Sequence, residues 1–234
     1  MSEYKKIHGI HVQALASDPS NLGSGQVWYN TTTNKLKITA VSTSGAWATG
    51  GNMGTGRYGL AGAGTQTAAL GFGGSDPSYT ITNATEQYDG SSWTAGGNMA
   101  DTRSASGGGT QTSAIGFGGG YPSTNVTEEY DGSAWTSGGN LSTARMNMAG
   151  AAANRDSALA FGGNANGQPP TNVTEHYDGS AWTAGGNMAT ARSNLGGLGT
   201  LSAGLAFAGY DGSTTNATEE YTGPGITTQI CSSS

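Results

Sequence analysis

Large and very small side chains alternate in one short block that recurs four times along the chain. The block reads ALGFGG at 69–74, AIGFGG at 114–119, ALAFGG at 158–163 and GLAFAG at 204–209. Because successive side chains of a strand point to opposite faces, this period-two pattern predicts a strand with one bulky face and one face pressed against neighbouring backbone. The bulky positions include all the phenylalanines of the chain: Phe72, Phe117, Phe161 and Phe207.

Two further blocks recur in step with the first. A tyrosine block, TNATEQYDG at 82–90 and its relatives, precedes a tryptophan block, SSWTAGGNMADTR at 91–103 and its relatives. The next tryptophan stands five positions after the tyrosine, and Asp-Gly lies between them, which is typical of a tight hairpin. An arginine follows each tryptophan by ten residues. The tryptophan and arginine positions are Trp47, Trp93, Trp135, Trp182, Arg57, Arg103, Arg145 and Arg192.

The tryptophans are 46, 42 and 47 residues apart, so the repeat is about 45 residues long and holds about four short strands. Such a unit cannot bury its apolar face alone, and stacked units can. After Tyr221 no tryptophan strand follows, whereas Trp47 has no phenylalanine block before it. We therefore expect an all-β propeller of four blades, closed by the N-terminal strand around Trp47, because closure removes exposed sheet edges. The alternative is five blades, with a composite blade built from 27–39 and the C-terminal ITTQI.

Composition agrees with a periodic architecture more than with disorder or helices. Glycine occurs 42 times in 234 residues, and Leu, Ile, Val and Phe total only 27. So few large aliphatic residues are typical of disordered chains, but a net charge of −6 is too small to keep a chain extended by self-repulsion. Glycine at this density disfavours helices. A pI near 4.8 disfavours nucleic-acid binding, and no apolar run is long enough to span a membrane.

Charge divides the chain into two parts. All four lysines lie within residues 1–37, which carry a net charge of +2, and the remainder carries −8. We interpret 1–25 as an N-terminal arm without a partner strand, for docking or oligomerisation, 26–44 as a β-hairpin linker, and 45–234 as the propeller. No secretory signal is recognised in the first residues, and the single Cys231 excludes a disulfide within the chain.

The order of Gly-Gly, Tyr-Asp, Trp and Met…Arg over residues 45–221 resembles the kelch repeat. The GGN[M/L] variant and the N-terminal GQVWYNTTTNKLK hairpin are similar to repeat proteins of tailed bacteriophages. The resemblance implies a kelch-like β-propeller in a virion structural protein, such as a tail fibre, spike or head surface appendage, that is assembled in the host cytoplasm. It also implies contact with other virion proteins through the arm and a homo-oligomer, with a trimer common among fibre proteins.

Residues that could carry catalysis or bind metal are few. His8 and His11 have no cysteine or acid cluster nearby, and His176 takes a repeat position held elsewhere by Gln or Glu, so we expect it to face solvent. The repeated glutamates are expected to pair with the repeated arginines across blades, as part of the scaffold. We therefore expect no enzyme, no metal and no cofactor. The four glutamates are Glu86, Glu128, Glu175 and Glu219.

Recognition is expected where the copies differ. The interval from phenylalanine to tyrosine varies between 13 and 16 residues, and these loops leave the same end of every blade. An exposed tyrosine can stack on a sugar face while Asp or Asn accepts hydroxyl hydrogen bonds. The alternative interpretation of the same residues is ordinary turn chemistry. The candidate ligand-binding residues are Tyr79, Tyr121, Tyr210, Asp76, Asp211, Asn164 and Asn166.

Three functions therefore compete. The first is a phage virion protein whose propeller binds host-surface glycan, and the second is a structural decoration or cap protein without a ligand. The third and most remote is a propeller enzyme that acts on polysaccharide. The variable loops distinguish the first from the second.

Overall fold

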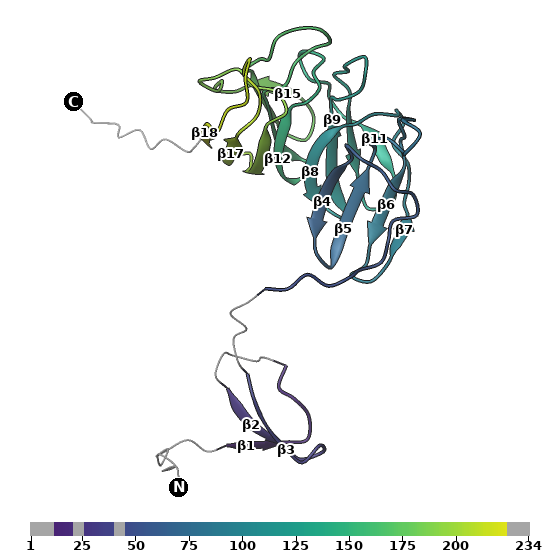
Figure 1. The fold of residues 1–234 in the computed structure, drawn as a ribbon, viewed down its shortest axis with the longest axis vertical. Helices are drawn as coiled ribbons and strands as arrows, with labels where there is room; N and C mark the ends of the chain where they lie inside the picture. The colour runs from purple at the N-terminus through teal and green to yellow at the C-terminus, as the bar shows by residue number, and fades with distance from the viewer. Residues whose placement is uncertain (1–11, 21–25, 40–44, 224–234) are drawn as a thin grey trace, which may run out of the picture. The chain divides into compact units, whose positions relative to one another are not determined.

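The computed structural model describes residues 12–20, 26–39 and 45–223, and it divides the chain into two compact units, 1–49 and 50–234. Every regular element in the described residues is a β-strand (Figure 1). His8, His11, Cys231 and the C-terminal ITTQI lie outside the described residues.

The first unit contains a three-stranded sheet, here the N-terminal sheet. A hairpin forms within 26–44, the segment interpreted as a hairpin linker: β2 (Val27–Asn30) pairs antiparallel with β3 (Lys35–Ile38). The expectation that the arm lacks a partner strand is wrong, because β1 (Gln13–Leu15) pairs parallel with β2. Asp18 stabilises the sheet. It accepts hydrogen bonds from the side chains of Trp28 and Asn30 and forms an ion pair with Lys37 at 2.6 Å. Lys37 first, then the two hydrogen bonds, lower the pKa of Asp18 to about 2.

The second unit contains four consecutive sheets, here the first to fourth repeat sheets. Each keeps its strands in chain order and pairs them antiparallel. The first is β4 (Ala61–Thr65), β5 (Ala68–Phe72), β6 (Thr85–Tyr88) and β7 (Trp93–Ala95). The second is β8 (Ser106–Thr110), β9 (Ser113–Phe117), β10 (Thr127–Tyr130) and β11 (Trp135–Ser137). The third is β12 (Ala149–Asn154), β13 (Ser157–Phe161), β14 (Thr174–Tyr177) and β15 (Trp182–Ala184). The fourth is β16 (Gly196–Thr200), β17 (Ala203–Phe207) and β18 (Thr218–Thr222).

The Asp-Gly hairpins form as expected, with four residues in the loop. Tyr130 pairs with Trp135, and between them the Asp131 carboxylate accepts the backbone N–H groups of Ser133 and Ala134, both at 2.8 Å. These backbone hydrogen bonds, that of Ala134 first, lower the pKa of Asp131 to about 2. Gly132 has φ of 99°, a conformation that glycine adopts without strain. A local carboxylate cap and one glycine therefore define the turn that repeats in each complete sheet.

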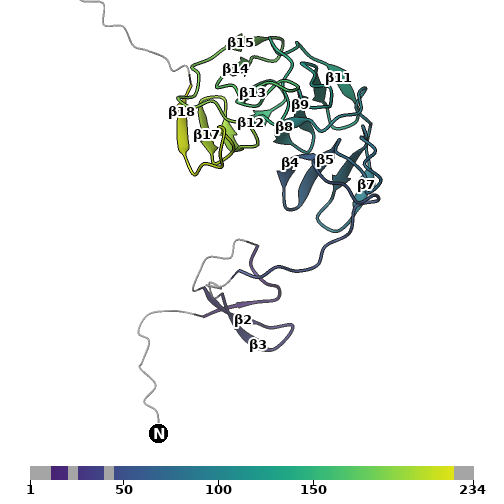
Figure 2. The same cartoon turned by 45° about the horizontal axis from the view of Figure 1, so that its top comes forward.

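Consecutive repeat sheets pack through their first strands, because β4 contacts β8, β8 contacts β12 and β12 contacts β16. The sheets therefore follow one another around an arc (Figure 2). Three hydrophobic clusters lie between neighbouring sheets, so each core is shared by two repeats. This arrangement explains how a chain with few aliphatic residues folds: each repeat buries the apolar face of the one before it.

The small residues of the alternating pattern receive the phenylalanine of the preceding sheet. A Cβ added at Gly107 or at Gly116 would lie only 2.9 Å from the ring of Phe72. The backbone neighbour expected from the sequence pattern is present at Gly107, where an added Cβ would lie 2.2 Å from the Ile115 carbonyl oxygen, whereas at Gly116 the nearest neighbour is the Phe72 ring. Close approach, and not backbone freedom, therefore explains glycine at these two positions.

The structure does not show the closing contact expected between the last repeat and Trp47. The fourth repeat sheet has three strands, and Trp47 lies in no strand with its side chain fully exposed. Among the described residues, no contact like that of β4 with β8 joins β4 to β16. Residues 27–39 belong to the N-terminal sheet with β1.

Candidate functional site

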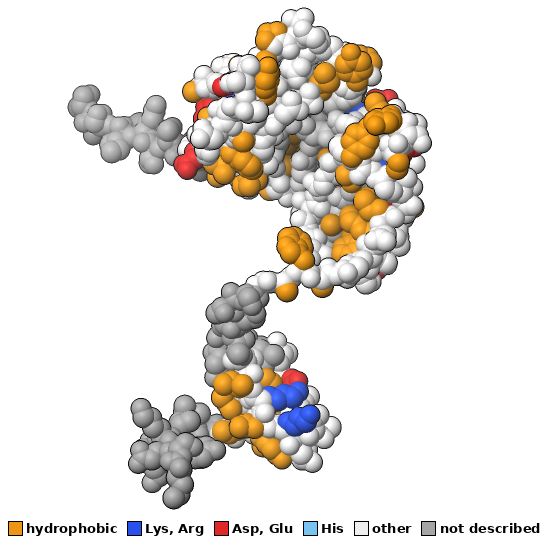
Figure 3. Space-filling view, viewed as in Figure 1, with side chains coloured by type: hydrophobic (Ala, Val, Ile, Leu, Met, Phe, Trp, Pro, Cys, Tyr) orange, Lys and Arg blue, Asp and Glu red, His pale blue; other side chains and the backbone are white. Residues whose placement is uncertain are grey.

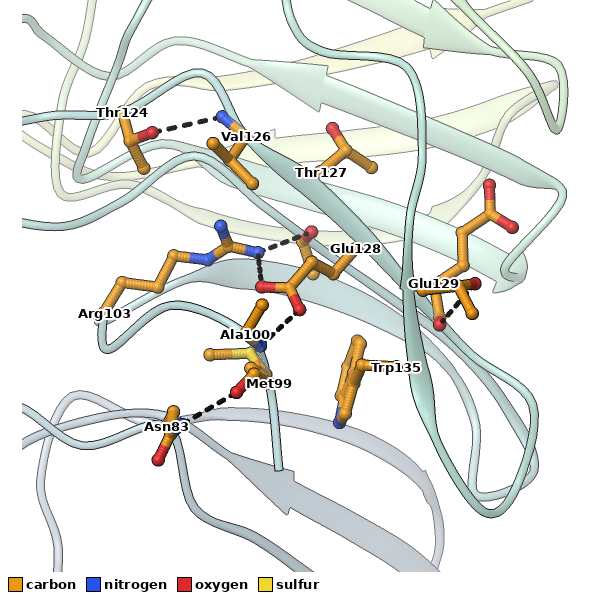
Figure 4. A network of polar contacts seen from close by, with 12 residues as sticks. Asn83, Met99, Ala100, Arg103, Thr124, Val126, Thr127, Glu128, Glu129 and Trp135 are labelled. Atoms are coloured by element: carbon orange, nitrogen blue, oxygen red, sulfur yellow. Dashed lines mark hydrogen bonds and ion pairs between the residues drawn. The ribbon is translucent and has the colours of Figure 1, made fainter. Parts of the chain in front are cut away.

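The repeated arginines and glutamates form a buried scaffold between neighbouring repeat sheets. The Arg103 guanidinium lies 3.0 Å from Glu128 Oε1, and both side chains are at most 2% exposed (Figure 4). Glu128 Oε2 accepts the backbone N–H of Ala100 at 2.7 Å. Meanwhile, the backbone carbonyl of Arg103 accepts the N–H of Gly74 from the end of the first sheet. The backbone of Arg103 therefore bonds to the first sheet and its side chain bonds to the second.

The other arginines repeat this geometry. In addition to its ion pair, Arg145 donates to the carbonyls of Gly162 and Val173 at 2.7 and 3.1 Å. Arg–Glu distances are 2.9, 2.5 and 2.8 Å for the remaining three pairs: Arg57–Glu86, Arg145–Glu175 and Arg192–Glu219. Burial lowers the pKa of Arg103 and Arg145, and the facing carboxylates act in the opposite direction. These carboxylates are engaged by arginine and backbone N–H groups, which fits the structural role expected for them.

The variable loops leave one end of the repeat sheets because of the strand order. In each sheet, the segment that contains the scaffold arginine leads into the first strand at that end, and the antiparallel second strand brings the chain back to the same end. The Asp-Gly hairpins and the turns after the first strands lie at the opposite end. We call the end that carries the variable loops the loop end. It carries the connections β5–β6, β9–β10, β13–β14 and β17–β18.

The three candidate tyrosines of the loop end are exposed to solvent. Tyr79 is 81% exposed and has φ of 64°, and its ring meets that of Tyr58 edge-on with 6.2 Å between centroids. Tyr121 is 76% exposed and is joined to Pro122 by a cis peptide bond. Tyr210 is 44% exposed. Large exposed aromatic side chains on a rigid support are typical of ligand-contacting positions.

The candidate acids and amides of the loops are engaged in local hydrogen bonds. Asp76 accepts the N–H groups of Ser78 and Thr80, and Asp211 accepts that of Ser213. These contacts correspond to turn chemistry, the alternative interpretation of these residues.

The two candidate asparagines join neighbouring segments. The Asn164 side chain accepts a hydrogen bond from Asn147 at 3.2 Å. Asn166 accepts the backbone N–H of Ser123 and so links the loop of the third sheet to that of the second. The structure thus gives the asparagines a supporting role in the loop end and leaves the tyrosines free to contact a ligand.

A groove at the loop end brings one candidate tyrosine beside an acid that sequence reasoning did not single out. Tyr121 and Pro122 line it from the second sheet, and Ile81 and Asp101 line it from the first. Asp101 and Tyr121 are both exposed. The groove therefore offers an aromatic face and a carboxylate across a junction of two repeats. Asp101 stands two residues before the scaffold arginine, where the other three copies all carry Thr, and this difference between copies is the signal that the sequence offers.

His176 does not face solvent as expected from its repeat position. Its ring bonds to the Tyr221 hydroxyl of the fourth sheet, and burial lowers its pKa. The equivalent Gln87 and Glu129 bond to the tyrosine hydroxyl of their following sheets, Tyr130 and Tyr177. The repeat position is a junction between sheets. A polar side chain at this position suggests exposure to solvent, but its hydrogen-bond partner is a tyrosine hydroxyl of the next repeat.

Surface charge differs between the two units. In the view of Figure 3, Lys and Arg side chains gather on the N-terminal sheet and are scarce on the repeat sheets. Four of the five arginines are buried or nearly so in the scaffold pairs, which explains this scarcity. Three or more His, Cys, Asp or Glu side chains in metal-binding geometry do not occur in the part of the chain described, and no helix there is long and apolar enough to cross a membrane.

Comparison with known proteins gives no relationship on which to base a function. No protein-family model matches the chain, and no curated protein sequence matches it significantly.

Proposed function

We propose that the chain is a recognition module of a tailed-bacteriophage virion, a kelch-like β-propeller of four blades that presents its loop end to a host-surface glycan. The four equivalent sheets and their buried Arg–Glu pairs support the propeller, whose ring is completed by the strand around Trp47. The resemblance of the repeats and the N-terminal hairpin to phage proteins supports the virion.

The observation that carries the binding role is the exposure of aromatic side chains at the loop end above a scaffold that is nearly identical in every repeat. A rigid support with variable loops is the usual construction of a recognition surface. The groove with Tyr121 and Asp101 provides the best single position for a sugar ring, because the tyrosine face can stack on its apolar side and the carboxylate can accept its hydroxyl groups.

Binding is favoured over catalysis by the state of the repeated carboxylates. A glycosidase needs two acids at a separation that holds a sugar and a water or nucleophile between them. Here the repeated glutamates are held by arginines and backbone N–H groups. The purely structural alternative, a decoration protein, is favoured by the turn hydrogen bonds of Asp76 and Asp211.

The test is a glycan array probed with the full chain, followed by titration of the best ligand. Replacing Tyr121 with Ala removes the stacking face, worth roughly 0.5–1.5 kcal/mol, and we expect affinity to fall by about 2- to 13-fold. Tyr121→Phe keeps the ring and is expected to retain most of the affinity. Gln66→Ala, in the turn between β4 and β5 at the opposite end, is the matched control and leaves affinity unchanged.

Two results would count against this function. If the combined variant of Tyr79, Tyr121 and Tyr210 to Ala adsorbs to host cells as the wild type does, the loop end is not the recognition surface. If the folded protein binds no glycan and its removal from particles leaves adsorption intact, the decoration role is correct.

Attachment to other virion proteins, in a homo-oligomer, is assigned to the N-terminal arm. Because β1 is part of the N-terminal sheet, removal of residues 1–11 tests the arm more cleanly than removal of the whole of 1–25. We expect the shortened chain to fold and to be absent from purified particles. Normal incorporation would exclude residues 1–11 as the attachment segment.

A further inference from the structure

Two of the junctions between repeat sheets hold a tryptophan in the same three-sided socket. The indole of Trp135 lies 4.8 Å from the Phe72 ring of the preceding sheet and 5.0 Å from Tyr130 of its own sheet. Its N–H donates to the Thr85 hydroxyl of the preceding sheet at 2.9 Å. The socket therefore has two aromatic walls and one hydroxyl acceptor.

Trp182 occupies the same socket one repeat later. Its centroid is 5.0 Å from Phe117 and 5.0 Å from Tyr177, and its N–H donates to Thr127 at 2.9 Å. Phenylalanine and threonine always come from the preceding sheet and tyrosine from the sheet of the tryptophan itself.

The third junction, between the third and fourth repeat sheets, has the same phenylalanine, threonine and tyrosine, but no tryptophan of the described residues lies among them. A pocket between the third and fourth repeat sheets is lined by Phe161, Thr174 and Tyr221, the three equivalents of the residues above. Ala206, which also lines it, corresponds to Ala160 of the third sheet, where an alanine already accommodates Trp182. Within the described residues, the fourth sheet has no strand that would carry a tryptophan.

The residues that follow Trp47 show which sheet its strand belongs to. A Cβ at Gly97 would meet the Ser133 carbonyl of the next sheet at 2.2 Å, and a Cβ at Gly51 would meet the Ser91 carbonyl of the first sheet at 2.3 Å. Gly51 also donates its N–H to that carbonyl at 3.1 Å. Gly51 thus lies on the first sheet as Gly97 lies on the second, four residues after its tryptophan in both cases.

In the complete repeats, the tryptophan four residues before such a glycine lies on the last strand of one sheet, and the glycine itself contacts the sheet that follows. The strand at Trp47 is therefore the last strand of whichever sheet precedes the first, and of the four repeat sheets as far as the structure describes them, only the fourth has that place open.

The two ends of the arc are complementary in a second way. Phe161 packs on Gly197 of the fourth sheet, where a Cβ would lie 2.6 Å from its ring. Phe207, the equivalent of Phe161, is 38% exposed, and its ring lies against Gly196 of its own sheet. In the first sheet the paired glycines Gly62 and Gly71 correspond to those that receive a phenylalanine elsewhere, and no phenylalanine ring lies near them.

We propose that the pocket of Phe161, Thr174 and Tyr221 is a tryptophan-binding site whose occupant is Trp47 of the same chain. Residues 47–49 add to β18 as an antiparallel fourth strand, with Trp47 opposite Tyr221 and Thr49 opposite Glu219, the register that β14 and β15 use. The indole N–H donates to the Thr174 hydroxyl. This site rests on the propeller proposed above and identifies the contact that closes it.

Ile226 competes for the same place, because it stands five residues after Tyr221 as a tryptophan stands after each earlier tyrosine. It lies outside the described residues. Its side chain cannot donate a hydrogen bond to Thr174, and this difference favours Trp47.

The test is NMR of the full chain labelled with ¹⁵N-tryptophan, in which each of the five indole N–H groups gives one signal. Trp47→Phe assigns the signal of Trp47. We expect Thr174→Val to shift the Trp47 signal and leave that of Trp182 in place, whereas the matched control Thr127→Val shifts Trp182 and leaves Trp47. We also expect the Trp47 N–H to exchange with solvent at least about tenfold more slowly in the wild type than in Thr174→Val.

Acrylamide quenching of the wild type against Trp47→Phe gives a second readout that needs no change in the pocket. A buried Trp47 contributes little quenchable fluorescence, so the two proteins are quenched alike. A Trp47 signal with free exchange, strong quenching and no response to Thr174→Val overturns the site. The site is also overturned if Trp47 is protected only in a dimer that depends on Trp47, because a second copy then fills the pocket. It is overturned as well if protection of the pocket is lost when the chain ends at residue 223, because Ile226 then fills it.

These results are independent of the glycan experiments. A chain with an exposed Trp47 that still binds glycan through Tyr121 refutes the tryptophan site and leaves the proposed function standing. Loss of glycan binding with Trp47 protected does the opposite.

Discussion

Replacing Arg145 with alanine tests whether the repeated ion pairs hold the sheets together. The Arg145 and Glu175 side chains are each 2% exposed and their charged atoms are 2.5 Å apart. Alanine would remove the cation and leave the Glu175 carboxylate buried, with only the Ser142 N–H at 2.8 Å as a remaining donor. Two backbone carbonyls, of Gly162 and Val173, would also lose their guanidinium donor.

The cost follows from this uncompensated charge. Breaking a buried ion pair from one side destabilises a protein by roughly 3–5 kcal/mol. For a domain of this size each kcal/mol lowers the melting temperature by about 2–4 °C, so Arg145→Ala is expected to lower it by roughly 6–20 °C. Urea denaturation measured alongside thermal unfolding checks the free energy directly.

The exposed pair of Arg155 and Asp156 provides the control. Their charged atoms are 3.6 Å apart and the side chains are 35% and 62% exposed, so Arg155→Ala is expected to cost less than about 1 kcal/mol. A combined Arg145→Met and Glu175→Leu variant removes both charges and is expected to recover much of the loss. If Arg145→Ala melts within about 2 °C of Arg155→Ala, the scaffold role of these pairs is refuted.

Two further predictions follow from the junctions between sheets. Burial lowers the pKa of His176, so its stabilising contribution is present above the ordinary value of 6.5 and is lost as pH falls from there toward the lower folded pKa. His176→Gln, which introduces the residue of the first sheet, is expected to flatten the fall in melting temperature between pH 7 and 5, and an unchanged slope would contradict this. Gly119 has φ of 84° and an added Cβ would lie 2.0 Å from the Ser104 carbonyl, so Gly119→Ala is expected to cost at least about 1–3 kcal/mol. The control Gly56→Ala, with open space around it, is expected to change the free energy of unfolding by less than about 0.5 kcal/mol, and equal melting of the two variants would refute the argument.

Most of the repeat architecture could be predicted because the informative residues act over short distances. The Tyr–Asp-Gly–Trp spacing predicts a hairpin since its carboxylate cap and glycine are local. The expected pairing of the repeated arginines with the repeated glutamates is confirmed. It could be predicted because the two opposite charges recur together at fixed positions of every repeat. The parallel pairing of β1 with β2 could not be predicted, because three residues without a strong pattern join a sheet only through a contact distant in sequence.

The site was only partly predictable for the same reason. Exposure of Tyr79, Tyr121 and Tyr210 agrees with their expected location in loops. The engagement of Asp76 in its own turn, and the position of His176 between sheets, depend on which neighbours lie across a junction. A polar residue at a repeat position can face solvent or the next repeat, and only the structure distinguishes the two.

The unequal ends of the repeat array follow from the way its cores are shared. Each core lies between two sheets, so four sheets in series form three cores and leave one apolar half-core at each end. At one end this half-core includes Leu198, which is 56% exposed, and Phe207, and at the other it includes the glycine pair Gly62 and Gly71, near which no phenylalanine ring lies. Solenoid arrays usually cover such ends with polar capping repeats, and neither end sheet here has a polar replacement at these positions. One end offers a phenylalanine and the other the glycines that receive one elsewhere in the array, and this complementarity supports the proposed ring, in which each end covers the other.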